Sequence, residues 1–89
     1  MFISTLRKGF QMTFENGWTI SVQWGYGNYC DNNTYYVSDF ENTKDLESTT
    51  AEIAMWDKDG KWFDFGNDTV KGYCSANEVA EWIDKCSKF

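Results

Sequence analysis

The sequence predicts an α+β fold in which one C-terminal helix packs on an antiparallel sheet of four or five strands. Two segments alternate apolar and polar residues around a turn that ends in glycine, a pattern typical of β-hairpins with one buried face. In the last segment, apolar residues recur at helical spacing instead. With 89 residues the chain has the size of one domain, so we treat residues 1–89 as a single unit.

The first hairpin is predicted over residues 9–24, around the turn Glu15-Asn16-Gly17. A two-residue loop would set apolar residues opposite polar ones, whereas a three-residue loop keeps the apolar side chains on one face. The three-residue loop requires a left-handed conformation at its last position, which Gly17 adopts without steric cost. The resulting pairs are Phe14 with Trp18, Met12 with Ile20, and Phe10 with Val22.

The second hairpin repeats this arrangement around Lys58-Asp59-Gly60, with Gly60 at the left-handed position. Its register places two tryptophans opposite each other on the face away from Ile53 and Phe63. The predicted pairs are Asp57 with Lys61, Trp56 with Trp62, Met55 with Phe63, and Ile53 with Phe65.

The C-terminal helix is predicted from its start signal and its apolar stripe. Ser75 and Glu78 form a capping box, and Cys74 and Val79 flank the cap as a hydrophobic staple. The stripe consists of Val79, Trp82, Ile83 and Cys86, and Phe89 continues it.

Two further strands are predicted, at residues 2–6 and 34–38. The second lies within residues 25–50, a long and polar segment with weak patterning. Connections of this length are uncommon in compact domains and are often functional when they occur.

The net charge of −6 argues against general binding of duplex nucleic acid, which draws its affinity from Lys and Arg. The charge fits a basic partner or solubility alone. The N-terminal residues lack the apolar stretch of a signal peptide, and no apolar run reaches the length of a membrane span. The three cysteines, Cys30, Cys74 and Cys86, are therefore expected to be free thiols in a cytosolic protein.

The sequence offers no set of catalytic or metal-binding residues. Histidine is absent, which removes the commonest general base and metal ligand. The scattered cysteines match no zinc pattern, and Gly60 comes too early in Asp57-Lys58-Asp59-Gly60 for a calcium loop. We expect no cofactor, no metal and no enzyme activity; a small hydrolase with paired carboxylates is the least favoured alternative.

Aromatic residues are the strongest indication of a contact surface. Five Trp, five Tyr and seven Phe exceed what so small a core can hide. One candidate site is Gly25-Tyr26-Gly27-Asn28-Tyr29 with the preceding Trp24, although these residues also fit a strand-ending turn. The other is the pair Trp56 and Trp62, which burial or self-association would equally explain.

Three cations are the candidate phosphate contacts if the ligand is a nucleotide: Arg7, Lys8 and Lys71. Scattered surface charge is the alternative interpretation. The acidic residues Asp39, Glu41, Asp45, Glu47 and Glu52 could imitate a phosphate track or belong to a solvated loop.

Several runs resemble short uncharacterised proteins of tailed bacteriophages and prophages. They are Thr5-Leu6-Arg7-Lys8-Gly9-Phe10, Asn16-Gly17-Trp18-Thr19-Ile20-Ser21-Val22-Gln23-Trp24-Gly25, Gly27-Asn28-Tyr29-Cys30 and Val70-Lys71-Gly72-Tyr73. The resemblance brings no catalytic residues with it. It implies a phage product that acts in the host cytoplasm, where small acidic phage proteins often counter host defences.

The sequence as a whole favours non-catalytic binding. Our first hypothesis is a phage-encoded inhibitor that binds a bacterial host defence protein. The alternative is a sponge that sequesters a nucleotide immune signal by stacking its bases on Trp or Tyr, and such sponges often build their pockets between subunits of a homo-oligomer. The ligand and the oligomeric state do not follow from the sequence.

Overall fold

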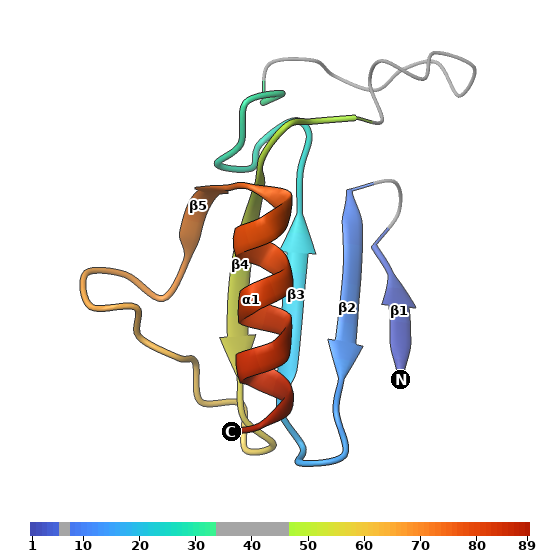
Figure 1. Cartoon of the computed structure of the whole chain (residues 1–89), viewed down its shortest axis with the longest axis vertical. Coiled ribbons are helices and arrows are strands. Elements are labelled where there is room, and N and C mark those ends of the chain that lie inside the picture. The colour runs from blue at the N-terminus through green and yellow to red at the C-terminus, as the bar shows by residue number, and fades with distance from the viewer. Residues whose placement is uncertain (6–7, 34–46) are drawn as a thin grey trace.

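A computed structural model describes residues 1–5, 8–33 and 47–89 and confirms the predicted fold class (Figure 1). Over these residues the chain forms five strands followed by one helix. They are β1 (Phe2–Ser4), β2 (Gly9–Thr13), β3 (Thr19–Gln23), β4 (Ala51–Trp56), β5 (Lys71–Cys74) and α1 (Ala76–Ser87). All neighbouring strands are antiparallel, and their order across the sheet is their order in the chain.

The β2–β3 hairpin has the predicted register. Met12 lies opposite Ile20, and the Phe14 N–H donates to the Trp18 carbonyl at 2.9 Å. Gly17 ends the turn with a φ of 87°, in the left-handed region that favours glycine. The Asn16 side chain then links the turn to the helix, because its Nδ2 donates to the Cys86 carbonyl at 2.9 Å.

The second turn is confirmed near its tip, but the prediction that Ile53 pairs with Phe65 is wrong. The Phe63 N–H donates to the Met55 carbonyl at 2.8 Å, and Trp56 bridges to Trp62 as expected. Ile53 instead pairs with Lys71 of β5. Phe65 does not pair with β4; its ring packs against Trp82 of α1 at a centroid distance of 5.0 Å, and the Phe63 ring packs against the same tryptophan at 5.7 Å.

The helix begins as predicted. Ser75 Oγ accepts from the Glu78 N–H at 3.2 Å, and Glu78 Oε1 accepts from the Ser75 N–H at 3.3 Å, which completes the capping box. Cys74 and Val79, the predicted staple, are both buried in the core. At the other end, Phe89 stacks on Phe63 with 5.4 Å between ring centroids.

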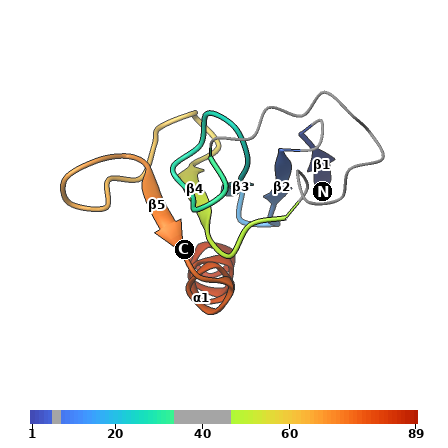
Figure 2. The same cartoon turned by 90° about the horizontal axis from the view of Figure 1, so that it is seen from above.

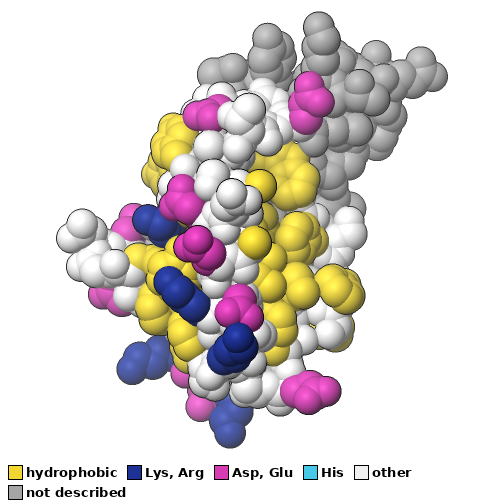
Figure 3. Space-filling view, viewed as in Figure 1, with side chains coloured by type: hydrophobic (Ala, Val, Ile, Leu, Met, Phe, Trp, Pro, Cys, Tyr) yellow, Lys and Arg dark blue, Asp and Glu magenta, His cyan; other side chains and the backbone are white. Residues whose placement is uncertain are grey.

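The core lies between α1 and the second half of the sheet. The helix covers β3, β4 and β5, and Ile20, Ile53 and Met55 are fully buried beneath it (Figure 2). β1 and β2 extend beyond the helix, and hydrophobic side chains are visible on the surface beside it (Figure 3). The predicted edge strand forms at Phe2–Ser4; Leu6 and the strand predicted at residues 34–38 lie outside the described residues.

Candidate functional site

The predicted site residues lie in three separate parts of the molecule. Trp24 follows β3 on the helix side of the sheet, near Lys8 in the β1–β2 connection. Trp56 ends β4 at the opposite end of the sheet, and Lys71 begins β5 at an edge. Arg7 lies outside the described residues.

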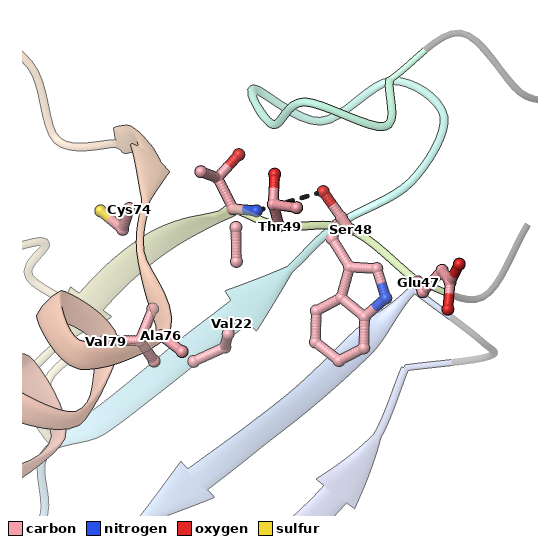
Figure 4. Close-up of a pocket in the computed structure, with 10 residues that line it drawn as sticks. Val22, Glu47, Ser48, Thr49, Cys74, Ala76 and Val79 are labelled. Atoms are coloured by element: carbon pink, nitrogen blue, oxygen red, sulfur yellow. Dashed lines mark hydrogen bonds between the residues drawn. The ribbon is translucent and has the colours of Figure 1, made fainter. Parts of the chain in front are cut away.

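Trp24 belongs to the apolar side of the sheet and not to an exposed aromatic platform. The Trp24 ring meets that of Phe10 edge-on at a centroid distance of 6.4 Å, and the backbone N–H of Trp24 donates to the Lys8 carbonyl at 2.7 Å. With Val22 and Val79 it lines a cavity of about 290 Å³ (Figure 4). Residues 47–50, all with polar side chains, line the same cavity.

The segment after Trp24 is a hydrogen-bonded turn. Gly25 and Gly27 have φ of 94° and 85°, and the Asn28 N–H donates to the Gly25 carbonyl at 3.1 Å. Asn28 Nδ2 also donates to the Trp24 carbonyl at 3.1 Å. The Cys30 side chain is fully buried, and its Sγ accepts from the Gly25 N–H at 3.2 Å. Asn28 and Cys30 therefore hold the backbone of this turn in place.

The end of the same turn is attached to β4 and β5. The Tyr29 N–H donates to Glu52 Oε2 at 2.6 Å, and the Tyr29 carbonyl accepts from the Tyr73 N–H at 2.8 Å. The Asp31 N–H donates to Thr50 Oγ1 at 2.8 Å. Side-chain acceptors and an edge strand thus fix a backbone that has no regular secondary structure of its own.

Three exposed tyrosines lie on this turn and on the neighbouring strand β5, and we call them the tyrosine surface: Tyr26 and Tyr29 on the turn, and Tyr73 on β5. Their side chains are 50%, 60% and 52% exposed. Tyr73 has a φ of 55°, a left-handed conformation that is strained for an aromatic residue. Its hydroxyl accepts from Asn33 Nδ2 at 3.4 Å. Sequence reasoning missed Tyr73, because no residue pattern in the short segment Lys71–Cys74 predicts a positive φ at this position.

Trp56 and Trp62 form a second exposed aromatic group, on the face away from the helix. Their rings stack with 5.2 Å between centroids and an interplanar angle of 28°. Trp62 is 47% exposed, whereas Trp56 is half-buried. The predicted cross-strand pair exists, but it lies at the opposite end of β4 from Tyr29.

The three thiols are buried and form no disulfide. Burial raises the pKa of the Cys86 thiol to about 11. The pKa of Cys74 is also raised, first by burial and then by Glu78, while Lys71 opposes the shift. Cys74 and Cys86 are therefore protonated at neutral pH and are poor nucleophiles.

The described residues contain no cluster of three or more side chains suited to hold a metal ion. Within the same part of the chain, no helix has the length and apolar character needed to cross a membrane. Comparisons of the chain with protein-family models, with curated proteins and with solved structures found no match. The structure itself defines the class: a small α+β protein with an antiparallel sheet, one C-terminal helix and an exposed tyrosine surface.

Proposed function

We propose that this is a non-catalytic binding protein that recognises another protein through its tyrosine surface. The observation that carries the proposal is a hydrogen-bonded backbone that presents exposed tyrosines: the chain around Tyr29 is held by Glu52, Tyr73 and a buried Cys30. A surface fixed before the partner arrives loses little conformational entropy on binding. Tyrosine suits such a surface because it offers a large amphipathic contact with only two rotatable side-chain bonds.

The charge of the chain favours a partner with a basic surface. The whole chain carries −6, and two carboxylates, Asp31 and Glu52, border the tyrosine surface. Complementary charge speeds encounter and orients the partner, while the aromatic contacts supply most of the affinity. In the finer form of the proposal, the partner is a host defence protein in the bacterial cytoplasm; the support for this form is the resemblance of several sequence runs to phage proteins.

The nucleotide-sponge alternative draws less support from the geometry of one chain. Lys8 and Lys71 lie near opposite edges of the sheet, so one small nucleotide cannot contact both within a single chain. Two of the rings predicted to stack on nucleotide bases already contact other side chains: Trp24 packs against the core, and the exposed Trp62 stacks on Trp56.

A binding comparison between matched aromatic variants tests the proposal. The wild-type chain is used to isolate a stoichiometric partner from bacterial lysate, and its affinity is then measured by calorimetry with purified components. We expect Tyr29→Ala/Tyr73→Ala to weaken binding at least about 100-fold, since central aromatic contacts dominate interfaces. Trp62→Ala, an equally exposed aromatic at the other end, is the matched control and should bind as wild type.

The backbone hydrogen bond between Tyr29 and Tyr73 survives substitution by alanine, so the double tyrosine variant should remain folded by circular dichroism. Undiminished binding by the double tyrosine variant would disprove the site. Heat released with a panel of cyclic nucleotides, and none with any protein, would favour the sponge instead.

A further inference from the structure

The turn between β2 and β3 carries the dipeptide Asn16-Gly17, and every other asparagine of the chain precedes a residue with a side chain. In an Asn-Gly sequence the backbone nitrogen of glycine can attack the side-chain amide carbon of asparagine, because no Cβ hinders the approach. The new N–C bond closes a five-membered succinimide, and the side-chain nitrogen leaves as ammonia. Water then opens the ring at either carbonyl and produces aspartate or isoaspartate. The reaction needs no enzyme, oxidant or cofactor.

The fold holds both of the reacting groups. The Gly17 N–H donates to the Phe14 carbonyl at 3.0 Å. The Asn16 side-chain amide is held at both ends, since its Oδ1 accepts from the Trp18 N–H at 2.9 Å and its Nδ2 donates to the Cys86 carbonyl at 2.9 Å. The reaction must deprotonate the Gly17 nitrogen and expel Nδ2, so it has to break hydrogen bonds that the folded chain satisfies.

The contact of Asn16 with the end of α1 joins residues that are far apart in the sequence. The turn lies at the C-terminal end of the helix (Figure 1), where Asn16 Nδ2 also donates to the main-chain oxygen of Phe89 at 3.4 Å. The Phe89 ring packs edge-on against the Trp18 ring at a centroid distance of 4.7 Å. Asn16 is exposed, so water reaches it as soon as this contact opens. Local opening of this kind costs less free energy than unfolding of the whole domain.

We propose that Asn16 is a site of spontaneous deamidation, which its contact with α1 suppresses and which opening of that contact permits. The product cannot restore the contact. Aspartate lacks the Nδ2 donor and places a negative charge beside the last carbonyls of α1, where the helix dipole is already negative. Isoaspartate also adds a methylene group to the backbone of a tight turn. This inference concerns the opposite end of β3 from Trp24 and does not depend on the proposed function.

The second hairpin offers a matched comparison. In its turn, Lys58-Asp59-Gly60, the Gly60 N–H donates to the Asp57 carbonyl at 3.0 Å, and the φ of 82° at Gly60 is close to the 87° at Gly17. Asp59 occupies the position of Asn16 and is exposed, but its side chain forms no hydrogen bond among the described residues. Asp59→Asn therefore creates a second Asn-Gly sequence with the same backbone hydrogen bond and without a contact to the helix.

The first test compares deamidation in the folded and the unfolded chain. The full wild-type chain is incubated at mildly alkaline pH with and without urea, and peptide mapping by mass spectrometry follows the conversion of the Asn16 amide to an acid. We expect reaction in urea and a rate at least about tenfold lower in the folded chain. A chain that does not react at Asn16 in urea, or that reacts equally fast when folded, would overturn the proposal.

The second test identifies the contact with α1 as the cause of the suppression. In Asp59→Asn both Asn-Gly sequences are followed in one sample, and each rate in the folded chain is divided by its rate in urea. Position 59 should react at least about tenfold faster than position 16 on this scale. Phe89→Ala, which removes the ring packed on Trp18, should accelerate the reaction at Asn16 about threefold. Equal relative rates at the two positions, or an unchanged rate in Phe89→Ala, would contradict suppression by this contact.

The third test measures the consequence of the modification for stability. Asn16→Asp has the same side chain as one deamidation product, and it should lower the folding equilibrium constant at least about tenfold by urea denaturation. Asp59→Asn, at the matched exposed position, should change this constant by less than about twofold. An Asn16→Asp variant as stable as wild type would show that the amide does not hold the turn against the helix, and the proposal would fail.

Discussion

The two edge strands of the sheet present opposite surfaces to solvent. β5 carries the cation Lys71, a register shift opposite Ala51 and Ile53, and a left-handed Tyr73 whose N–H is already bonded to Tyr29. All of these features discourage another strand from pairing with an edge. β1 is regular and consists of Phe2, Ile3 and Ser4, without a charged side chain. The difference indicates that edge protection in this fold is local: among the described residues it is found on β5 and not on β1.

The largest expected effect comes from Gly9→Ala, on the open side of the sheet. Gly9 has a φ of 148°, and an added Cβ would lie 1.9 Å from the backbone oxygen of Val22. Neither group can move without breaking the β2–β3 ladder, so we expect a loss of about 3 kcal/mol in the free energy of unfolding, measured by urea denaturation. Gly66→Ala, with a φ of 120° and open space around it, should lose only about 1 kcal/mol. Equal losses would contradict a steric cause at Gly9.

On the protected side, Gly72→Ala should have an intermediate effect. Its Cβ would lie 2.5 Å from Tyr29 Cβ, so the substitution pushes the tyrosine-bearing turn away from β5. We expect a loss of about 2 kcal/mol in the free energy of unfolding. In a Tyr29→Gly background, which removes the opposing Cβ, the loss should fall below about 1 kcal/mol. A cost that is the same in both backgrounds would show that the close approach is not its cause.

Two buried thiols, Cys74 in β5 and Cys86 in α1, predict a loss of stability at high pH. The folded-state pKa of Cys86 is raised to about 11 and that of Cys74 is raised as well, both mainly by burial, whereas exposed thiols ionise near 9.0. The unfolded chain therefore loses these protons first, so the stabilisation is present below pH 9 and is lost as pH rises toward 11. We expect Cys86 to contribute roughly 1–2 kcal/mol to this decline. Lysines and tyrosines titrate in the same range, so the measurement is the difference between wild type and Cys86→Ala; parallel curves would contradict the assignment.

The smallest expected effect on stability is that of Tyr73→Gly. The substitution relieves the left-handed strain at a φ of 55° and removes a half-exposed ring, so the two contributions offset each other to within about 1 kcal/mol. Partner binding should nevertheless weaken, because the ring belongs to the tyrosine surface. Thermal melting together with calorimetry separates the two properties. A fall in stability of more than about 2 kcal/mol would mean that Tyr73 is needed for folding rather than for contact.

Local sequence signals predicted the parts of the fold whose geometry depends on near neighbours. Gly17, Gly60 and the Ser75–Glu78 capping box each determine a turn or a helix start within a few residues. The pairing of Ile53 was predicted wrongly, because its partner Lys71 is far away in sequence and competes with the nearer Phe65. What decides that competition is the packing of Phe65 on Trp82, a tertiary contact that no local pattern reveals.

The candidate site was predictable only in part. Tyr26 and Tyr29 were identified from the glycines around them, and both are exposed. Trp24 shares the parity of Ile20 and Val22, so the alternation that predicted the strand already assigned its side chain to the core side. Tyr73 could not be found, since its contribution depends on a non-local hydrogen bond to Tyr29 and on a strained dihedral angle.

The strand order described above also has a consequence for how the chain folds. Because spatial neighbours in the sheet are consecutive in sequence, each strand can add to the one before it as the chain emerges from the ribosome. The helix follows all five strands, so the apolar face of the growing sheet stays uncovered until residue 87 is available. The capping box at Ser75 then stabilises the first turn of the helix that covers this face.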